Sequence, residues 1–457
     1  MTTPSATLVP VSTPMRIRRK EGILCGGSST QRPRSPGDDT KMAMSQLADA
    51  DRQLLLGGTL HGYRHHDVED AARRAGGVHV ATQPNGVVVH VLTVGLRQAR
   101  DLLGDPRLSK DAAAIIATMG RHMIAAGHDP RDLSAIIGPS MINSDAPRHT
   151  RLRHPVAAAM TSKRLARLQP RITGMVHDLL DDLDPDRPVD LVGQFALPLP
   201  LAVMCDLLGV PEGEDRSALA GWSSAMMTEV PEVQKPASDA MVGYLTALIE
   251  EKRTSPDEAL LSALVHGEVD GDRLTPEEVL TTAVLLVAAG HETTTAAIGN
   301  TAVGLLSTGT WSAVAQRPDT VPDAVQEGLR HDPPTRNIPH YLVTRDIELD
   351  GDTVPAGSIV MVNLGAANRD PDAFGADADR FDPFRRRGAG ALTHATFGNG
   401  PHRCVGSRLA TMEIEIALGE ITRRWPRARL VDPVDDLARG AAVVINGFDR
   451  VDVLLEP

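Results

Sequence analysis

Apolar residues recur at helical spacing over most of the chain, from about residue 46 to residue 332. The exception is the stretch 75–93, where two β-rich runs flank Pro84-Asn85-Gly86, a turn sequence typical of a hairpin. After residue 332 the pattern predicts, in order, strand-like runs at 340–349 and 357–364, a Gly- and Pro-rich loop over 370–403, a helix over 405–424 and a β-rich end over 442–457. This order predicts one mainly α domain with a small β portion, spanning 46–457.

The longest predicted helix begins at Thr275-Pro276-Glu277-Glu278, a capping box, and runs to about Ser307. Its midpoint, Ala288-Ala289-Gly290, has almost no side-chain bulk. Either a large flat group lies there, or another helix packs closely. The next residues include Glu292, and burying an unpaired carboxylate costs several kcal/mol. Glu292 therefore needs a specific role.

A second candidate is FGNGPHRCVG (397–406), in which glycines surround Cys404. Glycine permits tight turns and close backbone approach. A helix predicted to start at the cysteine favours a thiolate and lowers its pKa. Three roles are open at this point: a nucleophile with His402 as its base, a metal ligand, or a buried structural thiol.

Composition narrows the class of protein. The net charge of −12 argues against nucleic-acid binding. Cys25, Cys205 and Cys404 are too far apart for a zinc site or a disulfide framework, which indicates a reducing compartment.

No apolar run reaches the ~18 residues of a membrane span, so we expect a cytoplasmic protein that does not bind membranes. Residues 1–45 are rich in Ser, Thr, Pro and Arg and predict a disordered extension, unless synthesis starts at Met42 or Met44.

Four motifs together resemble the cytochrome P450 family, especially its soluble actinobacterial members, over about residues 50–457. In the family's order they are HTRLR (149–153), AAGHETTT (288–295), EGLR (327–330) and FGNGPHRCVG (397–406). The resemblance implies a single P450-type domain whose long central helix crosses haem b. It implies Cys404 as the iron ligand. The cofactor-binding residues it implies are His149, Arg153, Ala289, His340, Phe397, Gly398, His402 and Gly406. For His149 and Arg153 an exposed polar helix face is the alternative.

The resemblance also implies roles in catalysis and scaffolding. Thr293 faces iron-bound oxygen and Glu292 resupplies protons from a solvent channel, while Gly290 permits a local widening of the helix. His291 is expected at the surface or facing the channel. Glu327, Arg330 and Arg380 are expected to form a structural triad that positions the cysteine loop.

One departure from the family pattern concerns a propionate-binding arginine. The family usually carries it five residues before the Asp of a T-x-D strand. Counting back from Asp346 gives Tyr341, with His340 beside it. Either His340 substitutes for the arginine, or the Tyr341 hydroxyl donates one hydrogen bond.

The implied function is a monooxygenase that inserts one atom of O2 into a hydrophobic small molecule, by hydroxylation or epoxidation, in a natural-product tailoring step. Electrons are expected from a small ferredoxin and its NAD(P)H-dependent reductase. Arg403 and Arg408 form either a dock for the ferredoxin or scattered surface charge. The predicted substrate pocket comprises the stretch 125–142 and Ala288, Asn337, Ile338, Val444 and Ile445. The alternatives are a haem-thiolate peroxygenase driven by hydrogen peroxide and a non-catalytic haem-binding sensor.

Overall fold

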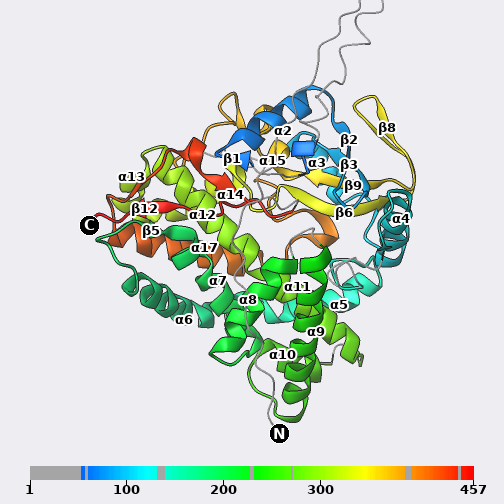
Figure 1. The fold of residues 1–457 in the computed structure, drawn as a ribbon, viewed down its shortest axis with the longest axis horizontal. Coiled ribbons are helices and arrows are strands. Elements are labelled where there is room, and N and C mark those ends of the chain that lie inside the picture. The colour runs from blue at the N-terminus through cyan, green and yellow to red at the C-terminus, as the bar shows by residue number, and fades with distance from the viewer. Residues whose placement is uncertain are drawn as a thin grey trace, which may run out of the picture. The chain divides into compact units, whose positions relative to one another are not determined.

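The computed structural model of the protein describes residues 53–56, 60–130, 139–226, 231–268, 271–385, 393–440 and 444–457. The extension predicted over residues 1–45 lies outside the described residues. Helices dominate and the strands are short, so the prediction of a mainly α fold with a small β portion is confirmed (Figure 1). No helix of the described residues is long and apolar enough to cross a membrane.

The helices are α2 (Arg64–Arg74), α3 (Leu96–Leu103), α4 (Ala112–Ala125), α5 (Arg148–Ala159), α6 (Ser162–Asp181), the π-helix η3 (Val192–Ala196), α7 (Pro198–Leu208), α8 (Glu214–Met226), α9 (Pro231–Thr254), α10 (Leu260–His266), α11 (Pro276–Gly290), α12 (Glu292–Ser307), α13 (Trp311–Ala315), η4 (Pro318–Thr320), α14 (Val321–His331), α15 (Leu364–Asn368), α16 (Pro371–Phe374), η5 (Gly400–His402), α17 (Ser407–Arg424) and η6 (Val434–Asp436). The strands are β1 (Leu60–His61), β2 (Val78–Thr82), β3 (Val88–Leu92), β4 (Leu108–Ser109), β5 (Val189–Asp190), β6 (Asn337–Val343), β7 (Ile347–Leu349), β8 (Asp352–Val354), β9 (Ile359–Asn363), β10 (Arg429–Leu430), β11 (Ala438–Arg439) and β12 (Asp452–Leu454).

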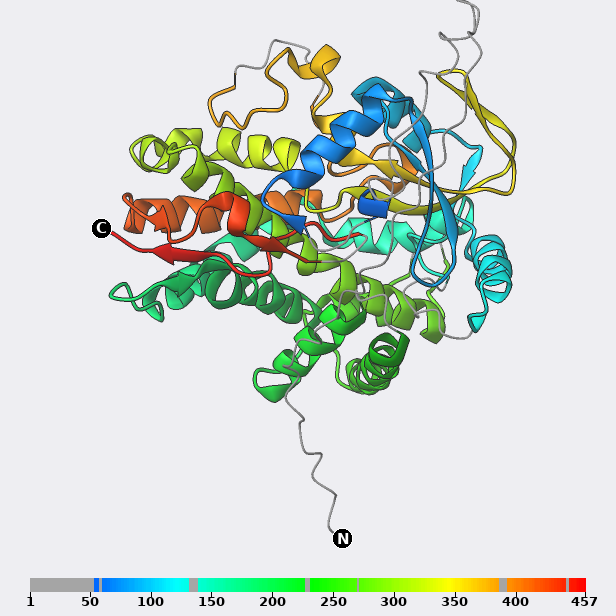
Figure 2. The ribbon, with the colours of Figure 1, turned by 45° about the horizontal axis from the view of Figure 1, so that its top comes forward.

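The main sheet has the order β2-β3-β9-β6-β4. Its hairpin β2–β3 turns at Gly86, whose φ of 84° suits glycine. Strand β9 is buried along its whole length, as its apolar run Ile359-Val360-Met361-Val362 requires, and lies between β3 and β6. Strand β6 carries a register shift between Ile338 and Tyr341. Figures 1 and 2 show this sheet beside α2 and α4, while α6 to α10 lie away from it.

The long helix is the centre of the helical part. Its second half, α12, is buried over almost its full length and packs against α14, α17 and η3. Its end at Ser307 and the capping box at Thr275 confirm the sequence prediction. Helix α17 lies along α6 in both views (Figures 1 and 2). This packing holds α12 and the start of α17 in one core.

Two predicted segments differ in detail. The stretch 46–75 is expected to be helical, but strand β1 (Leu60–His61) lies within it. Helix α2 therefore begins only at Arg64. In its described part, 444–457, the predicted β-rich end forms β12 and two isolated bridges, from Ile445 to Thr335 and from Phe448 to Arg439. Strand β12 pairs with β5 and β10, far away in sequence, so tertiary contacts rather than local pattern set its length.

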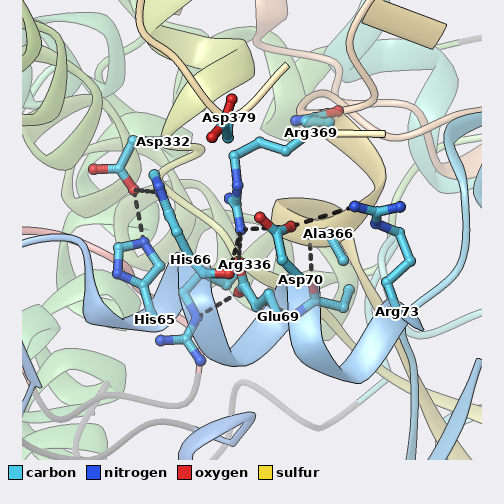
Figure 3. Close-up of polar contacts among 12 residues, drawn as sticks. His65, His66, Glu69, Asp70, Arg73, Asp332, Arg336, Ala366, Arg369 and Asp379 are labelled. Carbon is cyan, nitrogen blue, oxygen red and sulfur yellow. Dashed lines mark hydrogen bonds and ion pairs between the residues drawn. The ribbon is translucent and has the colours of Figure 1, made fainter. Parts of the chain in front are cut away.

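A buried polar cluster joins α2 to the end of α14 and to β11. We call it the Asp332 cluster: His65, His66, Asp332, Arg439 and Asn446. Asp332 accepts a hydrogen bond from His65 (3.1 Å) and one from the Asn446 amide (2.7 Å), and pairs with Arg439 (2.5 Å). Figure 3 shows both histidines pointing at this carboxylate. All five side chains are buried, and the Asp332 carboxylate and the Arg439 guanidinium neutralise each other inside the cluster.

Candidate cofactor and active site

The loop before α17 presents Cys404 through backbone geometry. Gly398 and Gly400 have φ of 71° and 68°, a region that side-chain-bearing residues rarely adopt. A Cβ atom at Gly400 would lie 2.8 Å from the Leu103 carbonyl oxygen. The Cys404 N–H donates to the Phe397 carbonyl (2.8 Å), which closes the loop between Phe397 and Cys404. These constraints explain why the glycines are needed to place the thiol.

The surroundings of the Cys404 thiol differ from the prediction. Burial raises the pKa of Cys404 above its ordinary value, and hydrogen bonds from the backbone N–H groups of Gly406 and Ser407 and the nearby arginines offset only part of this. The expected lowering of the pKa is therefore wrong for the protein without a metal, because desolvation exceeds the effect of the helix start. The side chain nevertheless stays accessible to solvent. Cys404 is thus surrounded by protein atoms while part of its surface remains exposed.

The long helix is interrupted at its midpoint, where Gly290 ends α11 and Glu292 begins α12. Around the break the Thr293 hydroxyl donates to the Ala289 carbonyl (2.9 Å) and the Thr294 hydroxyl to the Gly290 carbonyl (3.2 Å). Side-chain hydroxyls thus satisfy backbone carbonyls at the break, which lies at Gly290, where the sequence predicted a local widening. Ala289 is exposed although residues 282–288 are all buried. One bare face of this helix therefore borders open space.

Glu292 is held beside that break by two side chains. It accepts a hydrogen bond from the Ser224 hydroxyl of α8, and the His291 ring nitrogen Nε2 lies 3.5 Å from its Oε1. Burial raises the pKa of Glu292, but the contacts with His291 and Ser224 outweigh burial and hold it below its ordinary value. The carboxylate is thus ionised at neutral pH. Ser224 is exposed, which links Glu292 to solvent.

His291 is not at the surface, and this expectation is wrong. The side chain is fully buried, with Nδ1 3.2 Å from the Val287 carbonyl and 3.4 Å from the Ser223 hydroxyl. These contacts place its ring between α11 and α8. Its effect on the site is to support Glu292. Thr295 is buried, as expected for a packing residue.

Basic side chains gather on the other side of Cys404. We call Lys110, His149, Arg153 and His402 the basic rim. The rings of His149 and His402 lie 4.2 Å apart, and Arg153 donates to the Arg403 carbonyl (2.5 Å). Burial lowers the pKa of His402 to about 3, with further lowering by His149, Lys110 and Arg153. His149 Nε2 is buried without a hydrogen-bond partner in the part of the chain that the structure describes.

The two residues considered for the missing arginine both contact other side chains of the protein. His340 has a φ of 41°, and its Nε2 lies 3.3 Å from the Gln83 amide nitrogen. Tyr341 is buried, and its ring carries the Lys110 ammonium 3.9 Å above its centre. Sequence reasoning missed Lys110. The run Leu108-Ser109-Lys110-Asp111 gives no periodic signal for a buried lysine.

The expected triad is present with one change of member. Arg330 pairs with Glu327 through two hydrogen bonds of 2.7 and 2.8 Å, and both side chains are buried. The third guanidinium is that of Arg385, 3.2 Å from Glu327, and not that of Arg380. Arg380 is exposed and contributes only its carbonyl, which accepts from Arg330 (3.0 Å). Arg380 and Arg385 lie only five residues apart in the same loop. The spacing of the motif alone therefore does not decide which of them pairs with Glu327.

The predicted pocket residues are not equivalent. Ile338 lies 3.6 Å from the position of a Cβ on Gly398, so it borders the cysteine loop. Ile445 bridges to Thr335, which brings the C-terminal segment beside the start of β6. Asn337 is fully buried and its amide bonds to Leu55 and Asn363, so its expected role as a pocket wall is wrong. Ala288 is also fully buried, and of the stretch 125–142 residues 131–138 lie outside the described residues.

Comparison with known proteins shows which proteins this chain is similar to. A family model described as cytochrome P450 matches residues 300–427. The chain is 38% identical over 371 residues to cytochrome P450 107B1 of Saccharopolyspora erythraea, covering 81% of this chain and 90% of that protein. It is 40% identical over 359 residues to the cytochrome P450 monooxygenase PikC of Streptomyces venezuelae, covering 78% and 82%. The structure of the tirandamycin C-bound P450 monooxygenase TamI matches with a TM-score of 0.79 and 33% identity, over 90% of this chain and 99% of that one.

Proposed function

This chain belongs to the cytochrome P450 family and is a haem-dependent monooxygenase, and we propose that Cys404 is its iron ligand and that its substrate is a bulky hydrophobic natural product. The observation that carries the assignment of Cys404 is its accessible thiol in an enclosed loop, with backbone N–H groups directed at the sulfur. When bound, haem supplies the activation of dioxygen and the transfer of one oxygen atom to the substrate.

The residues present fit haem b. The Cys404 thiolate would hold the iron, and the backbone N–H groups of Gly406 and Ser407, which hydrogen-bond the sulfur, would tune that bond. The two haem propionates need donors, and His149 has a buried ring nitrogen without a partner among the described residues. Arg153 and His402 supply further donors beside it. Bare Ala289 leaves room for a flat ring system against the long helix.

Glu292 and Thr293 are assigned to proton delivery. The Thr293 hydroxyl donates its hydrogen bond to the Ala289 carbonyl. Its oxygen therefore remains an acceptor that can hold a water. Glu292 is ionised and hydrogen-bonded to exposed Ser224, so it can take a proton from the solvent side and pass it inward. This pair supports a dioxygen-driven reaction over a peroxide-driven one, because hydrogen peroxide already carries the protons.

We assign electron supply to a small ferredoxin and its NAD(P)H-dependent reductase, acting in the cytoplasm. Arg403 and Arg408 are exposed on either side of Cys404 in sequence. An acidic protein that docks there comes close to the sulfur ligand, and complementary charge raises the association rate. Charge reversal at Arg408, measured as the salt dependence of reduction, tests this surface.

The substrate class follows from the relatives and from the walls of the site. The relatives include PikC and a 6-deoxyerythronolide B hydroxylase, and the described walls, Ala289, Ile338 and Ile445, are apolar. Apolar walls select a hydrophobic ligand by burying its surface. We therefore propose a macrolactone or a similar polyketide, hydroxylated or epoxidised at a C–H or C=C bond.

The test is turnover of a panel of macrolactones with a surrogate ferredoxin, its reductase and ¹⁸O₂. We expect product that carries one ¹⁸O atom and depends on NAD(P)H. Product formed faster with hydrogen peroxide alone than with the electron-transfer proteins would favour the peroxygenase. Binding of haem without turnover of any hydrophobic compound would favour a sensor.

A further inference from the structure

Lys110 is a buried cation that no carboxylate neutralises in the described part of the chain. The side chain is 1% exposed, and its ammonium donates to the Pro339 carbonyl and lies over the Tyr341 ring. Asp145 is nearby, but it accepts from the Lys110 backbone N–H (2.9 Å) and the Ser109 hydroxyl (2.5 Å). Burying a cation is expensive unless an anion compensates. Burial lowers the pKa of Lys110 to about 7, which Asp145 offsets only in part.

Lys110 belongs to the same group of basic side chains as His402. Asp145 joins Lys110 to the basic rim, because its carboxylate accepts from the Lys110 backbone N–H (2.9 Å) and its backbone carbonyl accepts from the His149 backbone N–H (2.9 Å). His149 and Arg153 complete the basic rim from α5. Among the residues that the structure describes, Asp145 is the acid near both Lys110 and His149, and its carboxylate already accepts from the Ser109 hydroxyl. A set of donors with so little negative charge is incomplete without an added anion.

The position of Lys110 coincides with the departure from the family pattern. Tyr341 stands where the family usually carries its arginine, and His340 is turned to Gln83. The Tyr341 ring instead lies under the Lys110 ammonium, a cation–π contact that fixes the charge. The cation is thus supplied by β4 and the residue after it rather than by β6, at the same place in the fold, because β4 and β6 pair at Ser109 and Leu342.

We propose that Lys110 replaces the missing arginine and binds one propionate carboxylate of haem, with the Tyr341 ring holding its ammonium in place. The proposal rests on the proposed haem site. It gives Tyr341 a positioning role and assigns His340 none in propionate binding.

The test compares two cofactors in one protein. Protein is loaded with haemin or with haemin dimethyl ester, whose propionates carry no charge, and release to excess apomyoglobin is followed. The variants are Lys110→Met, which keeps the length of the side chain without its charge, Lys110→Arg, and Lys163→Met as an exposed control. A charge-assisted hydrogen bond changes an equilibrium by about tenfold to a hundredfold.

We expect Lys110→Met to release haemin about tenfold to a hundredfold faster than wild type and to release the ester at the wild-type rate. Lys110→Arg should stay near wild type, and Lys163→Met should match wild type with both cofactors. Equal acceleration for haemin and the ester, or none for either, would overturn the proposal. If Lys110→Met does not fold, Tyr341→Leu serves instead, with a smaller haemin-specific effect expected. Failure of the haem-thiolate assignment shows separately, as a wild-type reduced carbon monoxide spectrum without a thiolate-type band.

Discussion

Two groups of buried histidines in this molecule have opposite electrostatic states. In the Asp332 cluster a carboxylate meets two histidines, an amide and Arg439, and every charge has a partner (Figure 3). In the basic rim, Lys110, His149, Arg153 and His402 face one acid that is already engaged, and His149 Nε2 has no partner in the described residues. The first group completes the fold by itself, whereas the second needs an anion from outside the chain.

The largest expected effect is on the Asp332 cluster. Asp332→Ala leaves Arg439 buried without its partner, so we expect the free energy of unfolding to fall by about 3–5 kcal/mol. Chemical denaturation of the haem-free protein measures it. The control is Asp435→Ala, in an exposed or half-exposed turn outside the cluster. A stable variant with weakened haem binding would mean that the Asp332 cluster belongs to the cofactor site.

A second buried ion-pair network, around Glu327, includes Arg385 but not the side chain of Arg380. Arg385 pairs with buried Glu327 at 3.2 Å, whereas the Arg380 side chain is exposed. We expect Arg385→Ala to lower the free energy of unfolding by about 2–3 kcal/mol, since Arg330 still pairs with Glu327, and Arg380→Ala by less than about 0.5 kcal/mol. Thermal denaturation of both variants checks this. Equal losses would restore Arg380 to the triad.

The basic rim should behave in the opposite way. Arg153→Met removes a charge that no carboxylate of the described residues neutralises, so the unfolding free energy of the haem-free protein should change by less than about 1 kcal/mol. Haemin affinity, from fluorescence quenching, should fall by about tenfold. Arg164→Met, on the exposed side of α6, is the control. Loss of stability without loss of haemin affinity would make Arg153 a structural residue like Arg439.

At the helix break we expect only a small loss of stability, and the main change lies in the chemistry. Thr293→Ala removes one hydroxyl–carbonyl bond, worth about 1 kcal/mol. NAD(P)H consumption should persist, while product per NAD(P)H falls by at least about tenfold and peroxide rises. Thr294→Ala removes the equivalent bond to Gly290 and should leave coupling near wild type. Unchanged coupling in Thr293→Ala would remove its role in proton delivery.

The sequence predicted those parts of the molecule that local pattern determines. The capping box at Thr275, the hairpin turn at Gly86 and the helix after Cys404 each depend on neighbours along the chain, and all three are confirmed. The family motifs located the rest of the candidate site in the correct order. Its fold class followed from periodicity alone.

The misses depend on contacts between segments far apart in sequence. His291 is buried because Ser223 of α8 packs against it, and Arg385 rather than Arg380 reaches Glu327 because of how the loop after α16 folds back. The Asn337 side chain donates a hydrogen bond to the Leu55 carbonyl and accepts one from the Asn363 amide, so it is not available to line a pocket. The pKa of Cys404 is raised because the loop encloses the sulfur more than its spacing indicates. Lys110 gave no signal because its burial follows from the pairing of β4 with β6.

The most direct measurement is the absorption spectrum of the reduced protein with carbon monoxide, for wild type and Cys404→Ser. We expect a strongly red-shifted thiolate-type Soret band in wild type and its loss in the variant. An imidazole-type band in wild type, or a thiolate-type band that survives in Cys404→Ser, would contradict the assignment of Cys404 as the haem ligand.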